Sequence, residues 1–319
     1  MIAIFASLAP RFAQVEAVMT RSLASDEPRI QQLIEQLGSF HGKMLRPALV
    51  LLVAEAVGTV TADHVRLGAA LELIHTATLI HDDMIDEAAT RRGQPTAHVE
   101  HGVSIAVLLG DYFYTHAFDL VADFEQRWVV PRLTRTTNVI CRGELHQMCA
   151  RRDLGLTEGE YERIIHAKTA ALCELAGELG ALDADGGVRA AAAAYGHACG
   201  MAFQIVDDCL DFSGDPQKVG KTLATDIERG RLTLPLIRLL AKQAPAHREA
   251  LGRQLLEIRS ADDVARLRQV VLDSGVIADA IATARGHVAD AKRHLKGLPA
   301  GPGRDRLGDL ADFIVARDF

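Results

Sequence analysis

Two clusters of aspartate share one spacing and are suited to binding divalent metal ions. Each reads D-D-x-x-D, and the two begin 125 residues apart, at positions 82 and 207. The clusters consist of Asp82, Asp83 and Asp86, and of Asp207, Asp208 and Asp211. Residues four apart on a helix share a face, so carboxylates stack there and repel each other unless a cation lies between them. Hard oxygen ligands suit Mg²⁺, which also bridges to substrate phosphates. The repeated pattern therefore predicts Mg²⁺ sites that hold a diphosphate.

A solvated helix end is the alternative interpretation of one such cluster. The turns before the first cluster, Leu67–Ile80, are too apolar for a surface helix. Acidic residues at a helix C-terminus also oppose the helix dipole. The metal-binding interpretation is favoured for these reasons.

Basic residues near the clusters supply the charge that an anionic substrate needs. They are Lys43 and Arg46, Arg91 and Arg92, Lys168, and Lys221, Arg229 and Arg231. Arginine forks match phosphate oxygens in paired geometry, and lysine acts as a point charge. Each alone is typical of a surface cation. Together with the acidic clusters they predict two diphosphate sites, one bound through metal and one bound by cations alone.

Helical periodicity dominates the segments that must position these residues. The expected helices cover 48–57, 65–80, 103–121, 164–182, 189–210 and 232–240. Asp63 is expected to cap one helix, and Thr157 with Glu160 forms a capping-box pattern. Alternating strands, linkers and repeats of fixed period are not evident. The 319 residues are therefore expected to form a single all-α domain over 1–319, although length alone would suggest two domains.

Composition excludes several classes of protein. The net charge of −7 argues against nucleic-acid binding. Five cysteines without a C-x-x-C pair are expected to be reduced core residues. The N-terminus lacks the features of a signal peptide, and no apolar run reaches the roughly 18 residues of a spanning helix. A cytoplasmic protein without a transmembrane segment is expected.

Seven motifs in family order resemble the trans-type polyprenyl diphosphate synthases, especially the medium- and long-chain enzymes. They run from Gly42 to Pro235 and read HGKMLRP, ELIHTATLIHDDMIDEAATRRG, LLGDYF, GELHQM, AKTAAL, GMAFQIVDDCLDF and VGKTLATDIERGRLTLP. The resemblance implies a helical bundle of the isoprenoid synthase type around a deep central cavity. It also implies a homodimer, and transient membrane contact during product release.

The resemblance further implies a role for each matching residue. Metal ligands would be Asp82, Asp86, Asp207 and Asp211, holding three Mg²⁺ ions on an allylic diphosphate, with Asp83 and Asp208 beside them. Isopentenyl diphosphate would be bound by Lys43, Arg46, His75 and Arg92. Arg91, Lys168 and Lys221 would contact the allylic diphosphate, and Thr169 and Gln204 would line the reaction centre. The implied reaction is ionisation of the allylic diphosphate, condensation and proton elimination.

Four positions depart from the family pattern. His41 and Ala224 stand where the family usually has glycine, Met44 where a basic residue is common, and Arg231 where lysine is usual. None of them removes a metal ligand. They bear on affinity for isopentenyl diphosphate and on loop closure.

Product length is expected to depend on the helix before the first cluster. Side chains tilt toward a helix N-terminus, so the growing chain would run from Asp82 back toward Leu71. Ala77 and Thr78 are small, and Ile74 and Leu71 lie roughly 12 and 16 Å below Asp82. Small residues near the cluster predict a product longer than C20, with ordinary helix packing as the alternative explanation.

Other functions remain open at this point. A short-chain C15–C20 synthase would share the reaction. A class I terpene cyclase would also ionise an allylic diphosphate, but it needs no isopentenyl diphosphate site. A regulatory subunit would be expected to lose the acidic motifs, and a plain metal-binding bundle would not need the arginines.

Overall fold

The computed structural model describes residues 2–37, 44–214, 224–258 and 260–317. The chain falls into two compact units. Unit 1 consists of Met1–Arg135, Leu172–Gly196 and His294–Leu310, and unit 2 consists of Thr136–Ala171, His197–Arg293 and Ala311–Phe319. The single domain expected from the sequence stays a prediction.

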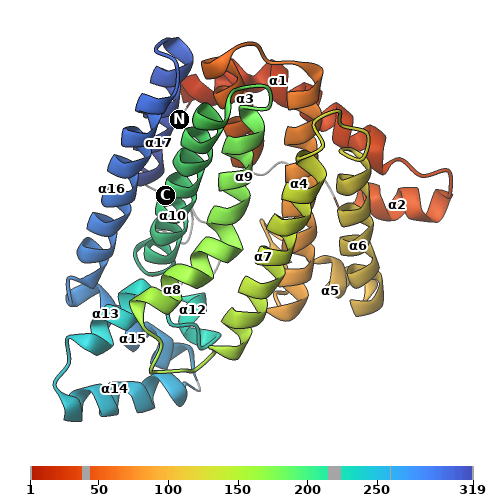
Figure 1. The fold of residues 1–319 in the computed structure, drawn as a ribbon. Coiled ribbons are helices and arrows are strands. Elements are labelled where there is room, and N and C mark those ends of the chain that lie inside the picture. The colour runs from red at the N-terminus through yellow and green to blue at the C-terminus, as the bar shows by residue number, and fades with distance from the viewer. Residues whose placement is uncertain (1, 38–43, 215–223, 259, 318–319) are drawn as a thin grey trace. The chain divides into compact units, whose positions relative to one another are not determined.

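Unit 1 is built around a long apolar helix, α4. Its elements in chain order are α1 (Ile2–Leu23), α2 (Pro28–Gln36), α3 (Leu45–Val57), α4 (Ala62–Ile85), β1 (Thr90–Arg91), β2 (Gln94–Pro95), α5 (Ala97–His101) and α6 (Val103–Asp119). Most of α9 (Ala171–Gly180), the start of α10 (Gly186–Ser213), η2 (Leu295–Gly297) and most of α17 (Pro302–Val315) complete it. Helix α4 packs against α1, α3 and α6 (Figure 1).

Unit 2 contains the second acidic cluster. Its elements are most of α7 (Val129–Cys149), α8 (Glu158–Ile165), the π-helix η1 (His166–Ala170), the rest of α10, α12 (Thr225–Glu228), α13 (Leu234–Ala241), α14 (Pro245–Leu256), α15 (Ala261–Asp273), α16 (Val276–His294) and the end of α17. Helix α13 packs against α8, α14 and α15 (Figure 1).

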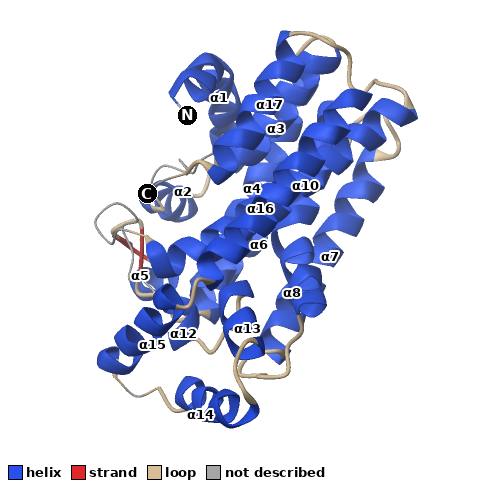
Figure 2. Ribbon diagram, turned by 90° about the vertical axis from the view of Figure 1, so that its left-hand side faces the viewer, coloured by secondary structure: helices blue, strands red, loops and turns tan. Residues whose placement is uncertain are grey.

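The expected helices are confirmed, and helices are the dominant secondary structure of the described residues. In the described part of the chain the strands are confined to one antiparallel hairpin, which pairs Thr90 with Pro95 and Arg91 with Gln94 (Figure 2). The capping box at Thr157 is also confirmed, because its Oγ1 accepts a hydrogen bond from the backbone N–H of Glu160 at 3.2 Å.

Two details of the sequence interpretation are wrong. The N-cap of α4 is Thr61 rather than Asp63, because Thr61 forms a capping box with the ring of His64, and Asp63 falls in the first turn. Cys141 and Cys149 are exposed rather than buried, since α7 turns both toward solvent. The other three cysteines are buried, and all five are free thiols.

Within the residues that the structure describes, we find no helix with the length and apolar character needed to cross a membrane.

Candidate active site

In unit 1, α4 ends at the first acidic cluster. The helix stops at Ile85, and Asp86 is its C-cap, so the apolar wall and the carboxylates belong to one element. Asp83 is 6% exposed and accepts two hydrogen bonds from Arg91, from Nε at 2.7 Å and from Nη2 at 2.6 Å. Each carboxylate oxygen of Asp83 therefore accepts a hydrogen bond from Arg91. Asp82 and Asp86 are the two carboxylates of the cluster that lie four residues apart.

Arg91 carries the counter-charge of this cluster. Burial opposes its charge, but the hydrogen bond to Asp83 and the nearby charges of Asp82 and Asp86 outweigh burial and raise the pKa of Arg91. The guanidinium therefore stays charged and partly offsets the repulsion among the carboxylates.

A strained two-residue turn carries Arg92. The turn joins β1 to β2, and its residues Arg92 and Gly93 both have positive φ, +52° and +77°. Two-residue hairpins favour this conformation, which glycine adopts freely and other residues adopt at a cost of about 1 kcal/mol. Strain of this kind is typical of functional sites.

Four polar side chains meet in the buried part of unit 1, behind the acidic end of α4. Arg46 and Glu72 are only 8% and 2% exposed, and Cys173 is fully buried. Arg46 Nε and Glu72 Oε2 have no hydrogen-bond partner among the described residues. Burial, followed by the charges of Arg46, Arg91 and Arg92, lowers the pKa of His75 well below its usual value. A neutral imidazole beside an unsatisfied guanidinium group is suited to binding an anion.

Glu72 is the acidic member of this group. Burial raises its pKa to about 7, although the charges of Arg46 and Arg92 act to lower it. The carboxyl group thus titrates near neutral pH inside a cationic surrounding.

The residues expected to set product length lie along α4 as predicted. Leu71, Ile74 and Ala77 are fully buried. Thr78 is partly buried and donates a hydrogen bond from Oγ1 to the carbonyl of His75 at 2.7 Å. Bulk added at Ala77 would therefore enter packed apolar surroundings.

In unit 2, the three aspartates of the second cluster have three different environments. Asp207 is 36% exposed and accepts a hydrogen bond from Arg317 Nη1 at 2.9 Å. Asp208 is buried and accepts from Tyr161 Oη at 2.6 Å and from Gln204 Nε2 at 2.7 Å. Burial, and then the charge of Asp226, raise the pKa of Asp208 to about 8 against those hydrogen bonds.

Asp211 helps to organise the start of α12. Its Oδ1 accepts from Thr225 Oγ1 at 3.0 Å, and its Oδ2 accepts from the backbone N–H of Asp226 at 3.1 Å. The backbone N–H of Ala224 donates to the carbonyl of Asp211. Ala224 has φ of +59°, which explains why glycine would suit this position.

The π-helix η1 of unit 2 carries Lys168 and Thr169, which are expected to contact the allylic diphosphate and to line the reaction centre. Lys168 donates from Nζ to Glu144 Oε2 at 2.6 Å, and Thr169 donates from Oγ1 to Gln204 Oε1 at 2.6 Å. Gly143 makes this approach possible, because a Cβ atom there would lie 2.5 Å from that of Ala167. Single π-turns are frequent at functional sites.

A pocket of about 90 Å³ opens beside these residues. Its polar lining includes Tyr161, Lys168, Gln204, Asp208, Arg231 and Thr233. Thr233 Oγ1 is buried and has no hydrogen-bond partner within the described part of the chain. The pocket therefore offers polar groups to a bound molecule.

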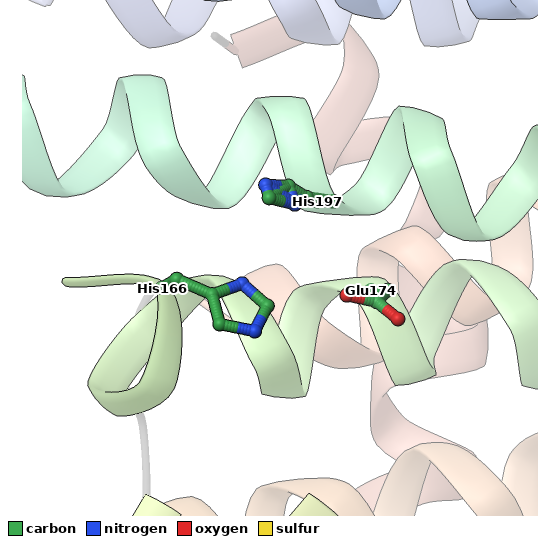
Figure 3. Close-up of side chains that lie close together, drawn as sticks. All are labelled: His166, Glu174 and His197. Carbon is green, nitrogen blue, oxygen red and sulfur yellow. The ribbon is translucent and has the colours of Figure 1, made fainter. Parts of the chain in front are cut away.

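Two histidines stack at the beginning of the π-helix η1. His166 from η1 and His197 from α10 have ring centroids 5.0 Å apart at 29° (Figure 3). Glu174, which Figure 3 also labels, accepts a hydrogen bond from Arg132 Nη2 at 2.6 Å in unit 1.

Sequence reasoning located the acidic clusters and the Lys168–Thr169–Gln204 group but missed their partners. The missed residues are Glu72, Glu144, Tyr161 and Arg317. A charged residue within an apolar segment was the available signal for Glu72 and Arg317. Lys43, Lys221 and His41 lie outside the described residues.

Each acidic cluster, taken by itself, has oxygen donors that fit a hard divalent cation. Asp82 and Asp86 offer carboxylate oxygens on one helix face, and Asp207 keeps a partly exposed carboxylate in unit 2. Carboxylate oxygens are the ligands that Mg²⁺ prefers. The residues present therefore fit the expected ion.

Comparisons with known proteins give the family and the fold of this chain. Residues 27–273 match the Polyprenyl synthetase family. The octaprenyl diphosphate synthase of Haemophilus influenzae is 39% identical over 249 residues, covering 76% of this chain and 75% of that protein. A short chain isoprenyl diphosphate synthase of Methanothermobacter thermautotrophicus is 36% identical, covering 89% of each. The crystal structure of a Caulobacter crescentus polyprenyl synthase, complexed with calcium and isoprenyl diphosphate, has a TM-score of 0.93 at 34% identity and covers 99% of this chain and 97% of that one.

The chain belongs to the polyprenyl synthetase family. The match extends beyond the stretch of motifs from Gly42 to Pro235 at both ends. The predicted isoprenoid synthase fold and the predicted enzyme class, a prenyltransferase of the polyprenyl diphosphate synthase type, are confirmed.

Proposed function

We propose that this protein condenses an allylic diphosphate with successive isopentenyl diphosphate units and releases a trans-polyprenyl diphosphate longer than C20. The observation that carries the proposal lies on α4. The acidic end of the helix is seven residues from His75, and buried Arg46 and exposed Arg92 lie close enough for their charges to lower the pKa of that imidazole. Seven residues are about 10 Å along a helix. One helix thus offers a metal-binding site and a metal-free anion site at a separation suited to two diphosphates.

Each site has its own role in the reaction. Asp82, Asp86 and Asp207 are proposed to hold Mg²⁺ at the allylic diphosphate, three ions in all, with Asp211 as a further ligand. Bound Mg²⁺ supplies Lewis-acid stabilisation of the departing pyrophosphate. Lys168 and Lys221 are proposed to contact the same diphosphate, with Arg91 holding Asp83 beside it.

The second substrate is proposed to bind without metal. Arg46, Arg92 and Lys43 would hold the diphosphate of isopentenyl diphosphate, and neutral His75 would donate a hydrogen bond to it. The double bond would then attack the allylic carbon as the C–O bond to pyrophosphate breaks, and loss of a proton would form a new double bond in the lengthened chain. The hydrogen-bonded pair of Thr169 and Gln204, 2.6 Å apart, supplies fixed dipoles that would stabilise the developing positive charge.

Product length is proposed to follow from the apolar face of α4. Ala77 is a small, fully buried residue just before the acidic end, and Ile74 and Leu71 continue the apolar face with fully buried side chains. Relatives of this chain include both octaprenyl and short chain synthases, so identity alone does not decide the length. The small side chain at 77 favours the longer product.

The assembly and location are part of the same proposal. A homodimer is supported by exposed apolar side chains on α5 and α6: Val99, Val103 and Leu108 are 54%, 61% and 63% exposed. Light scattering of the purified protein tests it, and a monomeric mass would contradict it. A cytoplasmic location is supported by the five free thiols.

The decisive experiment combines elongation assays with one pair of variants. The protein is incubated with Mg²⁺, isopentenyl diphosphate and dimethylallyl, geranyl or farnesyl diphosphate, and the products are sized. Elongation is expected, whereas cyclisation without use of isopentenyl diphosphate would indicate a terpene cyclase. Asp82→Ala should abolish condensation at saturating Mg²⁺. Asp63→Ala, at the other end of α4, is the matched control and should keep it; near-normal turnover of Asp82→Ala would refute the metal assignment.

A further inference from the structure

Arg317 is held on several sides in the interior of unit 2. It follows the end of α17 by two residues, and its side chain is only 2% exposed. Nε donates to the carbonyl of Ile314 at 3.0 Å, and Nη2 donates to the carbonyl of Phe203 at 3.1 Å. The guanidinium carbon also lies 3.9 Å from the centroid of the Phe203 ring. These contacts fix both the position and the plane of the guanidinium group.

The Nη1 atom of the same guanidinium group faces Asp207. Nη1 donates to Asp207 Oδ1 at 2.9 Å, across 110 residues of sequence. Asp207 is the first aspartate of the second cluster and is 36% exposed. One side of this carboxylate is therefore anchored in the protein, while the group stays accessible to solvent.

The anchor itself is rigid for a physical reason. Ile314 contributes one of the last carbonyls of α17, which cannot be paired inside the helix, and Arg317 donates a hydrogen bond to it. Swinging away from Asp207 would break the contacts to Ile314 and Phe203 and leave buried carbonyl groups less well satisfied. The position of Asp207 Oδ1 thus depends on the C-terminal segment of the chain.

We propose that Arg317 is a positioning residue for metal binding, whose guanidinium orients the Asp207 carboxylate so that it can accept a divalent cation. The proposal rests on the proposed function, in which Asp207 is a metal ligand. Groups that hydrogen-bond to a ligating carboxylate typically contribute 10–100-fold to metal affinity or activity. A guanidinium that merely competed with the cation for Asp207 would have the opposite effect, because its removal would tighten metal binding. The direction of the change therefore separates the two roles.

The test measures metal binding without turnover. Mn²⁺ is titrated into the purified, substrate-free protein, and free Mn²⁺ is followed by electron paramagnetic resonance. Arg317→Gln should raise the Mn²⁺ dissociation constant at least 10-fold. Arg317→Lys should lie between that variant and the wild type, because lysine restores the charge but not the planar fork. It also keeps the test informative if the Gln variant folds poorly, which circular dichroism and urea unfolding would reveal.

Two further variants identify the route of the effect. Lys292→Gln breaks a more exposed ion pair, between Lys292 of α16 and Asp312 of α17 at 2.6 Å, and should leave Mn²⁺ binding unchanged. Asp207→Asn removes the group through which Arg317 acts. Adding Arg317→Gln to Asp207→Asn should therefore cause no further loss of Mn²⁺ affinity, as expected for two residues in one interaction.

The outcomes separate this inference from the proposed function. Unchanged or tighter Mn²⁺ binding by folded Arg317→Gln would overturn the positioning role, and so would additive losses in the double variant. Elongation by the wild type alongside either result would leave the proposed function standing. The expected dependence on Arg317 in a protein that makes no elongated product would contradict the proposed function instead.

Discussion

Glu72 should make the protein less stable as the pH rises through neutrality. Its side chain is 2% exposed, and burial raises its pKa from 4.5 to about 7 despite the charges of Arg46 and Arg92. The folded protein therefore holds this proton more tightly than the unfolded chain does. The resulting stability is fully present below pH 4.5 and is lost as the pH rises through about 7. At about 1.4 kcal/mol per pH unit, the difference between 4.5 and 7 corresponds to about 3 kcal/mol.

The variant Glu72→Gln isolates this contribution. Urea unfolding is measured for both proteins at several pH values from 4.5 to 8, and the wild-type free energy of unfolding is subtracted from that of the variant. Groups that titrate identically in both proteins cancel in the difference. The free energy of unfolding of the variant, minus that of the wild type, should increase by about 3 kcal/mol from pH 4.5 to pH 8. Glu55→Gln, which replaces a 39% exposed carboxylate on α3, is the matched control and should not reproduce this change.

A flat difference between pH 4.5 and 8 would refute the reasoning, because it would mean that Glu72 titrates alike in the folded and unfolded protein. Binding offers a second check. The diphosphate of isopentenyl diphosphate would bring negative charge close to Glu72 and raise its pKa further. Calorimetry at pH 7.5 in two buffers of different ionisation enthalpy should therefore show proton uptake by the wild type, and less uptake by Glu72→Gln.

Two further predictions concern α4. Ala77→Tyr places bulk at a fully buried position and should shorten the product to about C15–C20, as chromatography of the hydrolysed products would show; an unchanged length would place the growing chain elsewhere. Gly110→Ala, on α6, should displace the imidazole of His81 on α4, because the new Cβ would overlap that ring. The ring lies at the end of a flexible side chain and alanine favours the helix by about 1 kcal/mol, so the loss of stability in urea unfolding should not exceed about 1 kcal/mol. Adding His81→Ala should recover part of that loss, and a loss that persists in full would show that the overlap is not its cause.

Local spacing explains what could be predicted from the sequence. The end of α4 at Asp86 follows from an apolar helical run that meets a block of carboxylates, and the capping box at Thr157 follows from residues three apart. Thr169 and Gln204 lie 35 residues apart in the sequence. They were named only through the family resemblance, and the hydrogen bond between them was not predicted. Helix bounds and motifs are thus local properties of this chain.

The partners of the acidic residues could not be predicted in this way. Tyr161 binds Asp208 over 47 residues of sequence, and Arg317 binds Asp207 over 110. Nothing in the spacing of either aspartate indicates which distant residue approaches it. The wrong prediction at Asp63 has a different, local cause. The ring of His64 accepts a hydrogen bond from the backbone N–H of Thr61, so Thr61 is the N-cap and α4 begins at Ala62.

In each acidic cluster, an arginine offsets part of the negative charge of the aspartates. Closely spaced carboxylates can be kept in place before metal binds only if part of their charge is offset. In unit 1, Arg91 binds Asp83, the second aspartate of its cluster, and in unit 2, Arg317 binds Asp207, the first. Asp208 is held by neutral donors instead. Each cluster therefore has an arginine partner, which is 40% exposed in unit 1 and 2% exposed in unit 2, and the orientation of the cluster before metal binding depends on a residue outside the D-D-x-x-D pattern itself. Variation at these two arginines should alter metal binding even where every aspartate is retained.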